Sequence, residues 1–374
     1  MNEKILHIIM HDVPWPADFG GVMDLFYKIK CLHKAGVKIH LHCFVNKRAP
    51  QPELEKYCLS VTYYKRKKYS SISFKLPFIV SSRINKELIA NLQKDDHPVI
   101  IEGIHCSYYL HAGMLNNRKV LLRLHNTEYQ YYSQLAIHEK NFIKKIYFSI
   151  EGKLLKKYEK QIASSTKIAT VSEQDEYLYK KAFGAKDIFH LPVFIPFTEA
   201  MGLEGNGCYC LYHGNLSINE NEKAAVWLLK EIFTHLPIPF VIAGKDPSAT
   251  LEELVKKHER TCLVANPGDK EMHDLIAKAQ VNILPSFNNT GVKLKLLNAL
   301  YNGRHCIVNK AGVTGSKLDG ACTIVDDAET FKTAVSYLYH VPYSRDINEA
   351  RNEILRKHYN NQKNTETLLN IFWP

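Results

Sequence analysis

Residues 281–315 read VNILPSFNNTGVKLKLLNALYNGRHCIVNKAGVTG and combine two short apolar runs with a polar loop and a helical pattern. The first apolar run, 281–284, has the length of a strand and ends at Pro285, because proline cannot donate to a sheet ladder. A polar loop then leads to Gly291, and residues 306–308 form the next buried strand. This stretch predicts strand, loop, helix and strand, with Gly291 where the loop enters the helix.

The helical pattern between these strands covers residues 292–301 and has one apolar face, formed by Leu296, Leu297 and Leu300. Gly303 is expected to end the helix in the left-handed conformation, which glycine adopts at no steric cost. Lys293 and Lys295 fall in the first turn, where the helix dipole disfavours cations and free N–H groups suit phosphate. Two lysines in that place indicate an anionic ligand.

This stretch resembles the donor-binding loop of the GT-B glycosyltransferases of the large retaining family-four group. The matching residues are Pro285-Ser286, Gly291, Lys293, Lys295, Asn298-Ala299, Gly303 and Cys306-Ile307-Val308. Thr290 and Asn298 stand where the family often carries two glutamates. The resemblance implies that Gly291, Val292, Lys293 and Asn298 bind a nucleotide diphosphate sugar, with Asn298 at the ribose hydroxyls.

Composition sets the broad class of the chain. Its 374 residues are enough for two domains, and its net charge of +11 indicates phosphate-bearing partners or a basic surface without a single partner. Nine cysteines without Cys-x-x-Cys spacing predict neither a zinc site nor a disulfide framework, and they fit a reducing cytoplasm. Neither a signal peptide nor a membrane span is expected.

The N-terminal region repeats the same order of elements, with strands at 5–10 and 37–44 and a helix at 22–34. The loop before the helix carries Gly20 and Gly21, which resemble the N-terminal glycine pair of the same glycosyltransferases. A missing Cβ lets backbone N–H groups approach the donor phosphate and sugar. A tight turn explains two glycines equally well.

Two histidines follow expected strands, His105 after the strand at 99–101 and His125 after the strand at 120–124. Ligands of open α/β sheets bind at the carboxyl ends of strands. The run RLHNTE at 123–128 resembles the His-Asn-x-Glu run of the family, which implies that His125 lies near the transferring sugar as the catalytic residue. A histidine that only caps a strand end is the alternative.

Two basic segments, 63–83 and 140–162, combine lysines with aromatic and aliphatic residues. Each is consistent with peripheral contact to an anionic membrane at the inner face. The alternatives are a solvated loop for the first and an ordinary amphipathic helix for the second.

The resemblance covers nearly the whole chain and implies two Rossmann-like domains facing a central cleft. We expect an acceptor domain at 1–197, a linker at 198–207, a nucleotide-sugar domain at 208–352 and a C-terminal helix at 353–374 that crosses back to the first domain. Asn215 follows a strand and Gly214, where many family members carry an arginine that holds the diphosphate; it is expected to contact the donor.

The function implied is transfer of a sugar from a UDP- or GDP-sugar to a saccharide or lipid-linked acceptor, in cell-surface polysaccharide or glycoconjugate assembly. By resemblance the reaction is retaining; without an Asp-x-Asp at a strand end, neither a metal nor another cofactor is expected. Thr290, Asn298 and Asn215 motivate an alternative, a GT-B-like binding or assembly protein with weak or no turnover. Nucleic-acid binding has no recognised motif here and is not expected.

Overall fold

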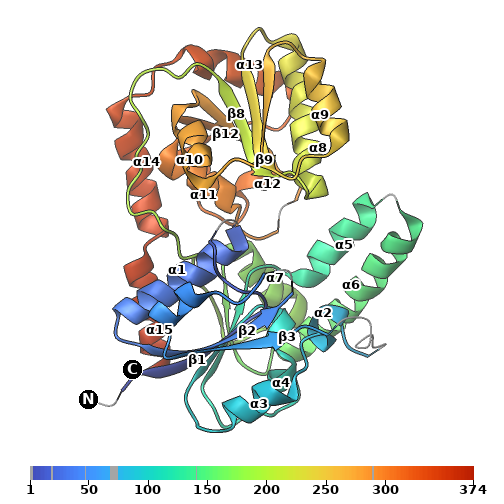
Figure 1. Cartoon of the computed structure of the whole chain (residues 1–374), viewed down its shortest axis with the longest axis vertical. Coiled ribbons are helices and arrows are strands. Elements are labelled where there is room, and N and C mark those ends of the chain that lie inside the picture. Colours follow the sequence, from blue (N-terminus) through green and yellow to red (C-terminus); the bar gives the residue numbers. More distant parts are fainter. Residues whose placement is uncertain (1–2, 18–19, 47, 68–74, 140, 289) are drawn as a thin grey trace. The chain divides into compact units, whose positions relative to one another are not determined.

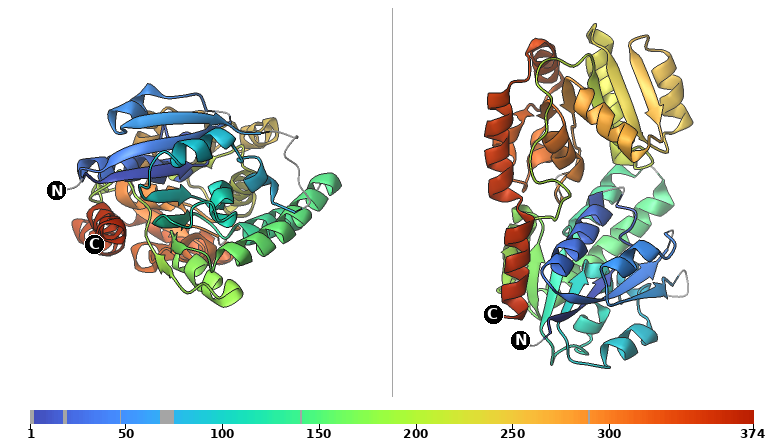
Figure 2. Two further views of the ribbon diagram at one scale, coloured as in Figure 1. Left: turned by 90° about the horizontal axis from the view of Figure 1, so that it is seen from below. Right: turned by 60° about the vertical axis from the view of Figure 1, so that its left-hand side comes forward.

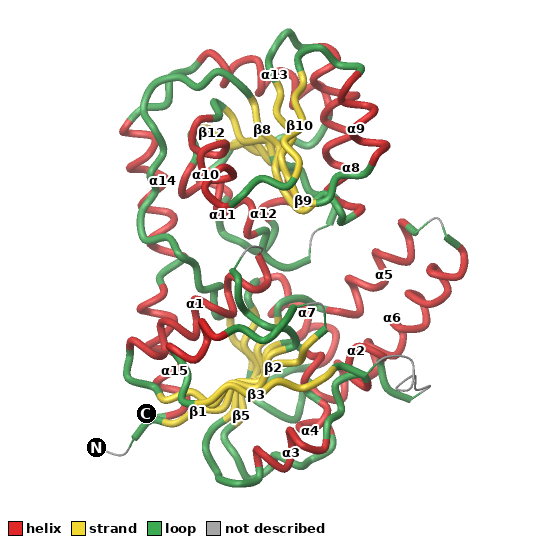
Figure 3. The backbone as a smooth tube through the Cα atoms, in the orientation of Figure 1, coloured by secondary structure: helices red, strands yellow, loops and turns green. Residues whose placement is uncertain are grey.

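The computed structural model describes residues 3–17, 20–46, 48–67, 75–139, 141–288 and 290–374 (Figures 1 and 3). The chain forms two compact units. The first comprises Met1–Pro196, Thr290–Val292 and Asn360–Pro374, and the second Phe197–Asn289 and Lys293–Tyr359. Each unit has its own parallel sheet flanked by helices, so the predicted class of two α/β, Rossmann-like units is confirmed.

The sheet of the first unit has seven parallel strands in the order β3-β2-β1-β4-β5-β6-β7. Their bounds are β1 Ile5–Met10, β2 Lys38–Val45, β3 Ser60–Lys65, β4 Val99–Glu102, β5 Val120–Leu124, β6 Lys167–Thr170 and β7 Ile188–His190. The central strands are nearly continuous apolar runs, because both faces of a parallel sheet are covered by helices.

Helices of the first unit cover both faces of this sheet. Their bounds are α1 Gly20–Lys34, α2 Phe78–Ser81, α3 Lys86–Leu92, α4 Tyr108–His111, α5 Glu128–His138, α6 Phe142–Ile162, α7 Glu173–Phe183 and α15 Asn361–Phe372. One core cluster joins α1 and α15 to β1 and β2, and includes Leu25, Ile29, Leu368 and Phe372. The other joins α3, α4, α6 and α7 to the opposite face.

The second unit has six parallel strands in the order β10-β9-β8-β11-β12-β13. The strands are β8 Cys210–Asn215, β9 Phe240–Lys245, β10 Thr261–Ala265, β11 Val281–Ile283, β12 His305–Val308 and β13 Thr323–Ile324. The helices are α8 Asn219–Trp227, α9 Ala249–Lys256, α10 Asp269–Lys278, α11 Leu294–Asn302, α12 Lys310–Val313, α13 Ala328–His340 and α14 Arg345–His358.

Both sheets have the same strand order counted from the start of each unit, namely third, second, first, fourth, fifth and sixth. The order reverses between β1 and β4 in the first sheet and between β8 and β11 in the second. Ligands of open α/β sheets bind outside the carboxyl ends of the strands at such a switch point. The fold therefore directs attention to the residues that follow these four strands.

Hydrogen bonds near the first and last residues of the second unit explain where this unit begins and ends. Residues 198–207, expected as a linker, group with this unit, because Ala200 N–H donates to Asn352 Oδ1 at 2.7 Å and Gly205 pairs with Tyr343. Helix α14 also stays in this unit. Only α15 packs on the first unit, against α1, which confirms that the C-terminal helix crosses back.

Three local expectations differ from the structure. Gly303 is extended, with φ −104° and ψ 171°, and a Cβ there would lie 2.8 Å from the Ala299 carbonyl oxygen, so close packing explains the glycine. Gly20 and Gly21 lie in the first turn of α1 instead of in the loop before it. Strand β3 forms where a basic loop was expected, and residues 68–74 of that segment lie outside the described residues.

Candidate functional site

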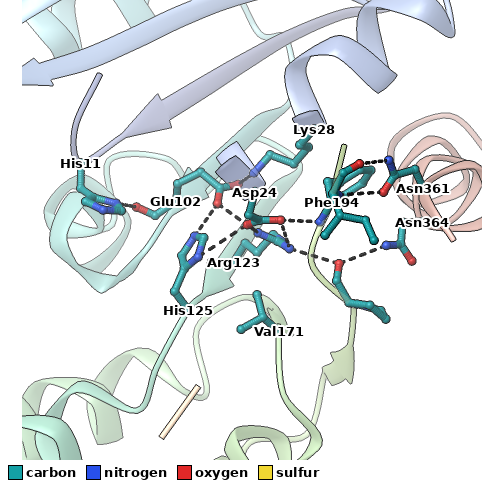
Figure 4. Close-up of polar contacts among 12 residues, drawn as sticks. His11, Asp24, Lys28, Glu102, Arg123, His125, Val171, Phe194, Asn361 and Asn364 are labelled. Carbon is teal, nitrogen blue, oxygen red and sulfur yellow. Dashed lines mark hydrogen bonds and ion pairs between the residues drawn. The ribbon is translucent and has the colours of Figure 1, made fainter. Parts of the chain in front are cut away.

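Five charged or ionisable side chains of the first unit meet at the carboxyl ends of β4 and β5, beside the point where the strand order reverses between β1 and β4 (Figure 4). Glu102 ends β4, Arg123 lies in β5 and His125 follows β5. Asp24 and Lys28 come from α1, where a spacing of four residues places them on one face. The sequence therefore brings two acids, two cations and a histidine together from three neighbouring elements.

Each buried cation in this cluster is ion-paired with a buried carboxylate. Arg123 binds Asp24 through both terminal nitrogens, with Nη2–Oδ1 at 3.0 Å, and Nη1 lies 3.5 Å from Glu102 Oε2. Lys28 binds the other oxygen of Glu102. Burial alone would raise the pKa of Glu102, but Lys28, His125 and Arg123 lower it well below its usual value. Both acids are therefore ionised, and the two cations balance them.

His125 is the member of this cluster that reaches solvent. Its side chain is 17% exposed, whereas the side chains of Lys28, Glu102, Arg123 and Asp24 are at most 1% exposed. Nε2 of His125 lies 2.8 Å from Glu102 Oε2, and Nδ1 lies 3.6 Å from Asp24 Oδ2. Because an ionised carboxylate only accepts, Nε2 carries the proton and donates it to Glu102. The cluster thus fixes the orientation of the ring.

Asp24, Glu102 and His125 could together hold a metal ion, because one ligand atom from each lies within 4.8 Å of the others. Both carboxylates are already paired with buried cations, however. A divalent ion would add two positive charges to a buried group that is electrically neutral, which is unfavourable unless Lys28 or Arg123 moves away. The donor set therefore fits a hydrogen-bonding site better than a metal centre.

Two further histidines line the same switch point. His11 follows β1, and its Nδ1 lies 3.4 Å from the Glu102 carbonyl oxygen. Burial, followed by the charges of His125 and Arg83, lowers the pKa of His11 to about 3. His105, after β4, has a buried Nδ1 that finds no hydrogen-bond partner in the described part of the chain, and burial lowers its pKa well below the ordinary value. Both rings are neutral and stack at 4.9 Å between centroids.

The cluster is also connected to the last helix of the chain. Asp24 Oδ1 accepts from the Phe194 N–H at 2.6 Å, and Arg123 Nη2 donates to the Pro192 carbonyl at 3.3 Å. The same carbonyl accepts from Asn364 of α15 at 3.1 Å. The side-chain amide of Asn361 accepts from the Ile195 N–H through Oδ1 and donates to the Ile195 carbonyl through Nδ2. The segment after β7 is therefore fixed between the charge cluster and α15 (Figure 4).

A partly buried lysine, Lys295, marks the switch point of the second unit. Its Nζ donates to Tyr212 Oη at 3.3 Å and to Asn221 Oδ1 at 3.0 Å, and it lies 4.9 Å from the centre of the Tyr212 ring. Burial lowers the pKa of Lys295 to about 8; Glu220 opposes this shift and Lys293 adds to it. Among the described residues no carboxylate is ion-paired with Lys295, so an anionic ligand would supply its missing counter-charge.

Ser286, in the segment directly after β11, is hydrogen-bonded to two neighbouring elements of the second unit. Ser286 is buried, and its hydroxyl donates to Glu220 Oε1 at 2.9 Å. Its backbone N–H and C=O both bind the amide of Asn309, at 2.9 and 2.7 Å. The Pro-Ser motif found in the sequence thus ties the carboxyl ends of β11 and β12 to the start of α8.

The residues expected to bind the donor have different environments. Gly291 has φ 63°, the left-handed region that favours glycine, and it groups with Val292 in the first unit. Lys293 is the N-cap of α11 in the second unit. Asn215 Oδ1 accepts from the N–H and hydroxyl of Ser217 at 3.0 and 2.7 Å, and Asn298 Oδ1 accepts from Asn302 at 2.7 Å. Both asparagine oxygens therefore already have partners.

Sequence reasoning missed several of the residues that build these sites. Asp24, Lys28 and Glu102 are not among the residues that the sequence predicts for a site. Lys295 was noted beside Lys293, but Lys293 was preferred. One sequence signal does favour Lys295. This lysine lies four residues after Gly291, in the first turn of a helix whose apolar face is buried.

Comparison with known proteins identifies what this fold resembles. Residues 207–340 match the family described as "Glycosyl transferases group 1". That range contains the whole second switch point, including Tyr212, Asn221, Ser286 and Lys295. The resemblance inferred from the sequence is therefore confirmed.

The whole chain also aligns with proteins of similar length. An "Uncharacterized 44.6 kDa protein in cps region" of Klebsiella pneumoniae is 27% identical over 377 residues, covering 95% of this chain and 96% of the relative. The structure of sucrose-phosphate synthase from Thermosynechococcus elongatus superposes with a TM-score of 0.72 at 17% identity, covering 99% and 98% of the chains. Anabaena HepE, solved with UDP and glucose, gives 0.66 at 11% identity and 98% of both chains. These structures show that the fold is GT-B.

Proposed function

We propose, starting from a GT-B fold with a group 1 glycosyl transferase region, that this chain is a glycosyltransferase. It transfers a sugar from a nucleotide diphosphate sugar, a UDP- or GDP-sugar, to a saccharide or lipid-linked acceptor. The observation that carries the proposal is Lys295: a lysine without a carboxylate partner among the described residues, at the switch point where α/β sheets bind ligands.

In this proposal the second unit binds the diphosphate. Lys295 is the cation, and the first N–H groups of α11 are the neutral donors. Negative charge builds up on the diphosphate as the glycosidic bond breaks. Donors that are already in place stabilise this charge more in the transition state than in the ground state, which is how they accelerate the reaction.

In this proposal His125 of the first unit hydrogen-bonds the sugar that is transferred. Nε2 donates to Glu102, whose other oxygen is held by Lys28, whereas Nδ1 lies 3.6 Å from Asp24 Oδ2 and makes no hydrogen bond to it. A ring fixed in this way can bond a sugar hydroxyl at its exposed edge without losing side-chain entropy on binding. Glu102 acts as the positioning residue for His125.

We also propose a retaining outcome without a required metal ion. The retaining outcome follows from the resemblance to the family-four glycosyltransferases. Metal independence is supported by the cluster in the first unit, where two buried cations already balance the carboxylates, and by the lysine available to the diphosphate in the second unit.

The relatives suggest where such a reaction belongs. Anabaena HepE has been solved with UDP and glucose, and the Klebsiella relative is encoded in a cps region. We propose a role in cell-surface polysaccharide or glycoconjugate assembly. All nine cysteines are unpaired thiols, which supports a reducing cytoplasm as the compartment.

Thermal shift is the first test. UDP, GDP and their sugars are added to the protein with and without EDTA, and a ligand at about ten times its Kd should stabilise the fold by about 1.4 kcal/mol. Any nucleotide sugar that binds is then incubated with the enzyme, and released sugar is analysed by NMR for its anomeric form. Release of the anomer present in the donor supports retention; no shift with any nucleotide contradicts the proposal.

A GT-B-like binding or assembly protein is the second candidate. It is favoured by Thr290 and Asn298 at the positions of two family glutamates, and by the engagement of Asn298 and Asn215 with neighbouring side chains. Both candidates should bind the donor, so donor binding does not tell them apart. Slow hydrolysis of the donor does, because only a transferase releases the sugar. A protein that binds UDP and never releases sugar, with acceptor or with water, belongs to this second class.

A further inference from the structure

The hairpin formed by α5 and α6 carries a concentrated group of exposed apolar side chains. Phe142, Ile143, Ile146, Tyr147 and Ile150 of α6 are 73, 78, 43, 41 and 52% exposed, and Ile137 of α5 adds to them at 63%. The hairpin extends away from the sheet of the first unit (Figures 1 and 2). Six exposed large apolar side chains gathered on one projecting hairpin indicate an interaction surface.

The exposed side chains of α6 form one stripe. At 3.6 residues per turn, the five positions from Phe142 to Ile150 span about 140° of the helix circumference. The buried positions of the helix, which include Leu155, Tyr158 and Ile162, centre roughly 140° away from this stripe. The stripe therefore lies on the side of α6 that does not pack on the core, and core packing does not explain its apolar residues.

Charge on α6 is divided in the same way. The six lysines of the helix are all exposed, namely Lys144, Lys145, Lys153, Lys156, Lys157 and Lys160. Its two acidic residues, Glu151 and Glu159, are both buried. Lys144 and Lys145 flank the apolar stripe on its two sides, about 60° beyond either edge. The solvent-facing surface of the helix therefore combines apolar side chains with positive charge alone.

We propose that this surface, defined by the stripe Phe142–Ile150 and the lysines of α6, binds the face of an anionic lipid bilayer. Helices that lie in the bilayer interface place apolar side chains below the headgroups and lysines among them. A second copy of the chain is a poor occupant, because two such faces would bring six lysines against six. The inference does not require the glycosyltransferase proposal, and it deepens that proposal by bringing the enzyme to a surface where lipid-linked acceptors reside.

Vesicle sedimentation tests the proposal. The protein is mixed with vesicles of phosphatidylcholine alone and with vesicles that also contain phosphatidylglycerol, over a series of salt concentrations. Binding is expected on the anionic vesicles and should weaken as salt rises. Equal binding to both vesicles, or none to either, overturns the proposal.

Paired variants separate the two components of the surface. Lys144→Gln with Lys145→Gln should weaken binding about 25-fold, since each lysine contributes about fivefold at an anionic surface. Phe142→Ser with Ile143→Ser should weaken it at least about tenfold by removing apolar area. Matched controls are Lys180→Gln with Lys181→Gln on α7, and Leu59→Ser with Met114→Ser, all exposed and outside the hairpin.

Both controls should bind vesicles like the wild type. If they weaken binding as much as the hairpin variants, the effect is one of overall charge or apolarity and the proposal fails. Sedimentation velocity is run on the same variants, and a dimer that dissociates only in the hairpin variants would identify a second copy as the occupant instead. The thermal shift with UDP is measured in parallel, so that loss of donor binding and loss of membrane binding are told apart.

Discussion

Glu102 Oε2 accepts a hydrogen bond of 2.8 Å from His125 Nε2, while Lys28 holds the other oxygen of the same carboxylate. The two partners of Glu102 differ in exposure, because Lys28 is completely buried and the His125 side chain is 17% exposed. One carboxylate therefore joins a buried structural cation to a side chain that can meet a ligand. Stability and activity should depend on Glu102 through these different partners.

Removing the charge of Glu102 should be costly for folding. Glu102→Gln leaves Lys28 as a buried cation without its counter-charge, which costs about 3–5 kcal/mol when one partner of a buried pair is removed. Urea denaturation measures the change in the free energy of unfolding. The double variant Lys28→Met with Glu102→Gln should recover part of the loss, since no unpaired charge is then buried.

An exposed pair supplies the control for this experiment. Glu253 and Lys256 lie 2.7 Å apart on the surface of α9, with both side chains about two-thirds exposed. Glu253→Gln should leave the denaturation midpoint nearly unchanged, because water screens such pairs. If Glu102→Gln is as mild as Glu253→Gln, the buried charge balance described here is wrong.

His125 should matter for turnover far more than for folding. His125→Ala removes the group proposed to contact the sugar and should lower kcat at least about 100-fold. The thermal shift with UDP should persist, because the nucleotide is assigned to the second unit. His125→Gln keeps a donor that can reach Glu102 but lacks the second ring nitrogen. Full activity in His125→Gln would show that His125 acts only by satisfying Glu102.

Much of the fold could be predicted from local patterns. Parallel strands buried on both faces are short apolar runs, and the runs at 99–101, 120–124 and 281–284 were correctly predicted as strands. Strand β3 was missed because it is an edge strand, SVTYYK, that is partly exposed and runs into a basic segment. An edge strand has a neighbour on one side only, so its sequence lacks the continuous apolar signal.

The site could be predicted only where a residue follows a strand. His125 was found in this way, because strand ends define the ligand-binding edge. Asp24 and Lys28 could not be found, since an Asp–Lys pair four residues apart on a helix is typical of a solvated face. Their burial depends on Glu102 and Arg123, which are distant in sequence. Lys293 was preferred to Lys295 because helix position alone does not reveal the contacts of Lys295 with Tyr212 and Asn221.

Lys295 should control nucleotide binding and its pH dependence. Lys295→Ala removes a charged hydrogen-bond donor worth about 2 kcal/mol, so the Kd for UDP should rise roughly 30-fold. Burial lowers the pKa of Lys295 to about 8 in the free protein, and a bound diphosphate favours the charged form. Affinity should therefore fall by up to about tenfold per pH unit above pH 8. Calorimetric titration measures both effects.

Two comparisons decide whether Lys295 or Lys293 carries this effect. Lys295→Arg stays charged at every pH used and should remove the pH dependence that begins at pH 8. Lys293→Ala should weaken UDP binding less than Lys295→Ala, because Lys293 is at the N-cap position, before the first turn of α11, whereas Lys295 is bonded to the polar groups of the switch point. The opposite order would restore Lys293 as the principal phosphate ligand.

A second group of histidines, His7 and His42, forms an ordered chain of hydrogen bonds on β1 and β2. His7 Nε2 lies 3.0 Å from both oxygens of Asp95, so it carries the proton and its Nδ1 accepts from His42 Nε2 at 2.9 Å. His42 Nδ1 then accepts from Tyr64 Oη at 2.8 Å, which in turn accepts from Asn91 at 2.9 Å. With both rings neutral, every nitrogen has one role in this chain.

This chain should make the protein sensitive to mild acid. Burial lowers the pKa of His7 to about 4 and that of His42 to about 3; Asp95 opposes both shifts, and Arg118 and His40 add to them. Unfolded histidine titrates near pH 6.5, so the unfolded state binds a proton first as pH falls, and stability is lost between about pH 6.5 and 4. Between pH 6.5 and pH 5, each histidine that stays neutral in the fold costs about 2 kcal/mol of stability. Urea denaturation from pH 7 to 5 measures this loss of unfolding free energy. The loss should be smaller in His42→Gln than in the wild type, and unchanged in the control His33→Gln, whose histidine is exposed. If His42→Gln loses as much stability as the wild type, the two rings are not held neutral in the fold.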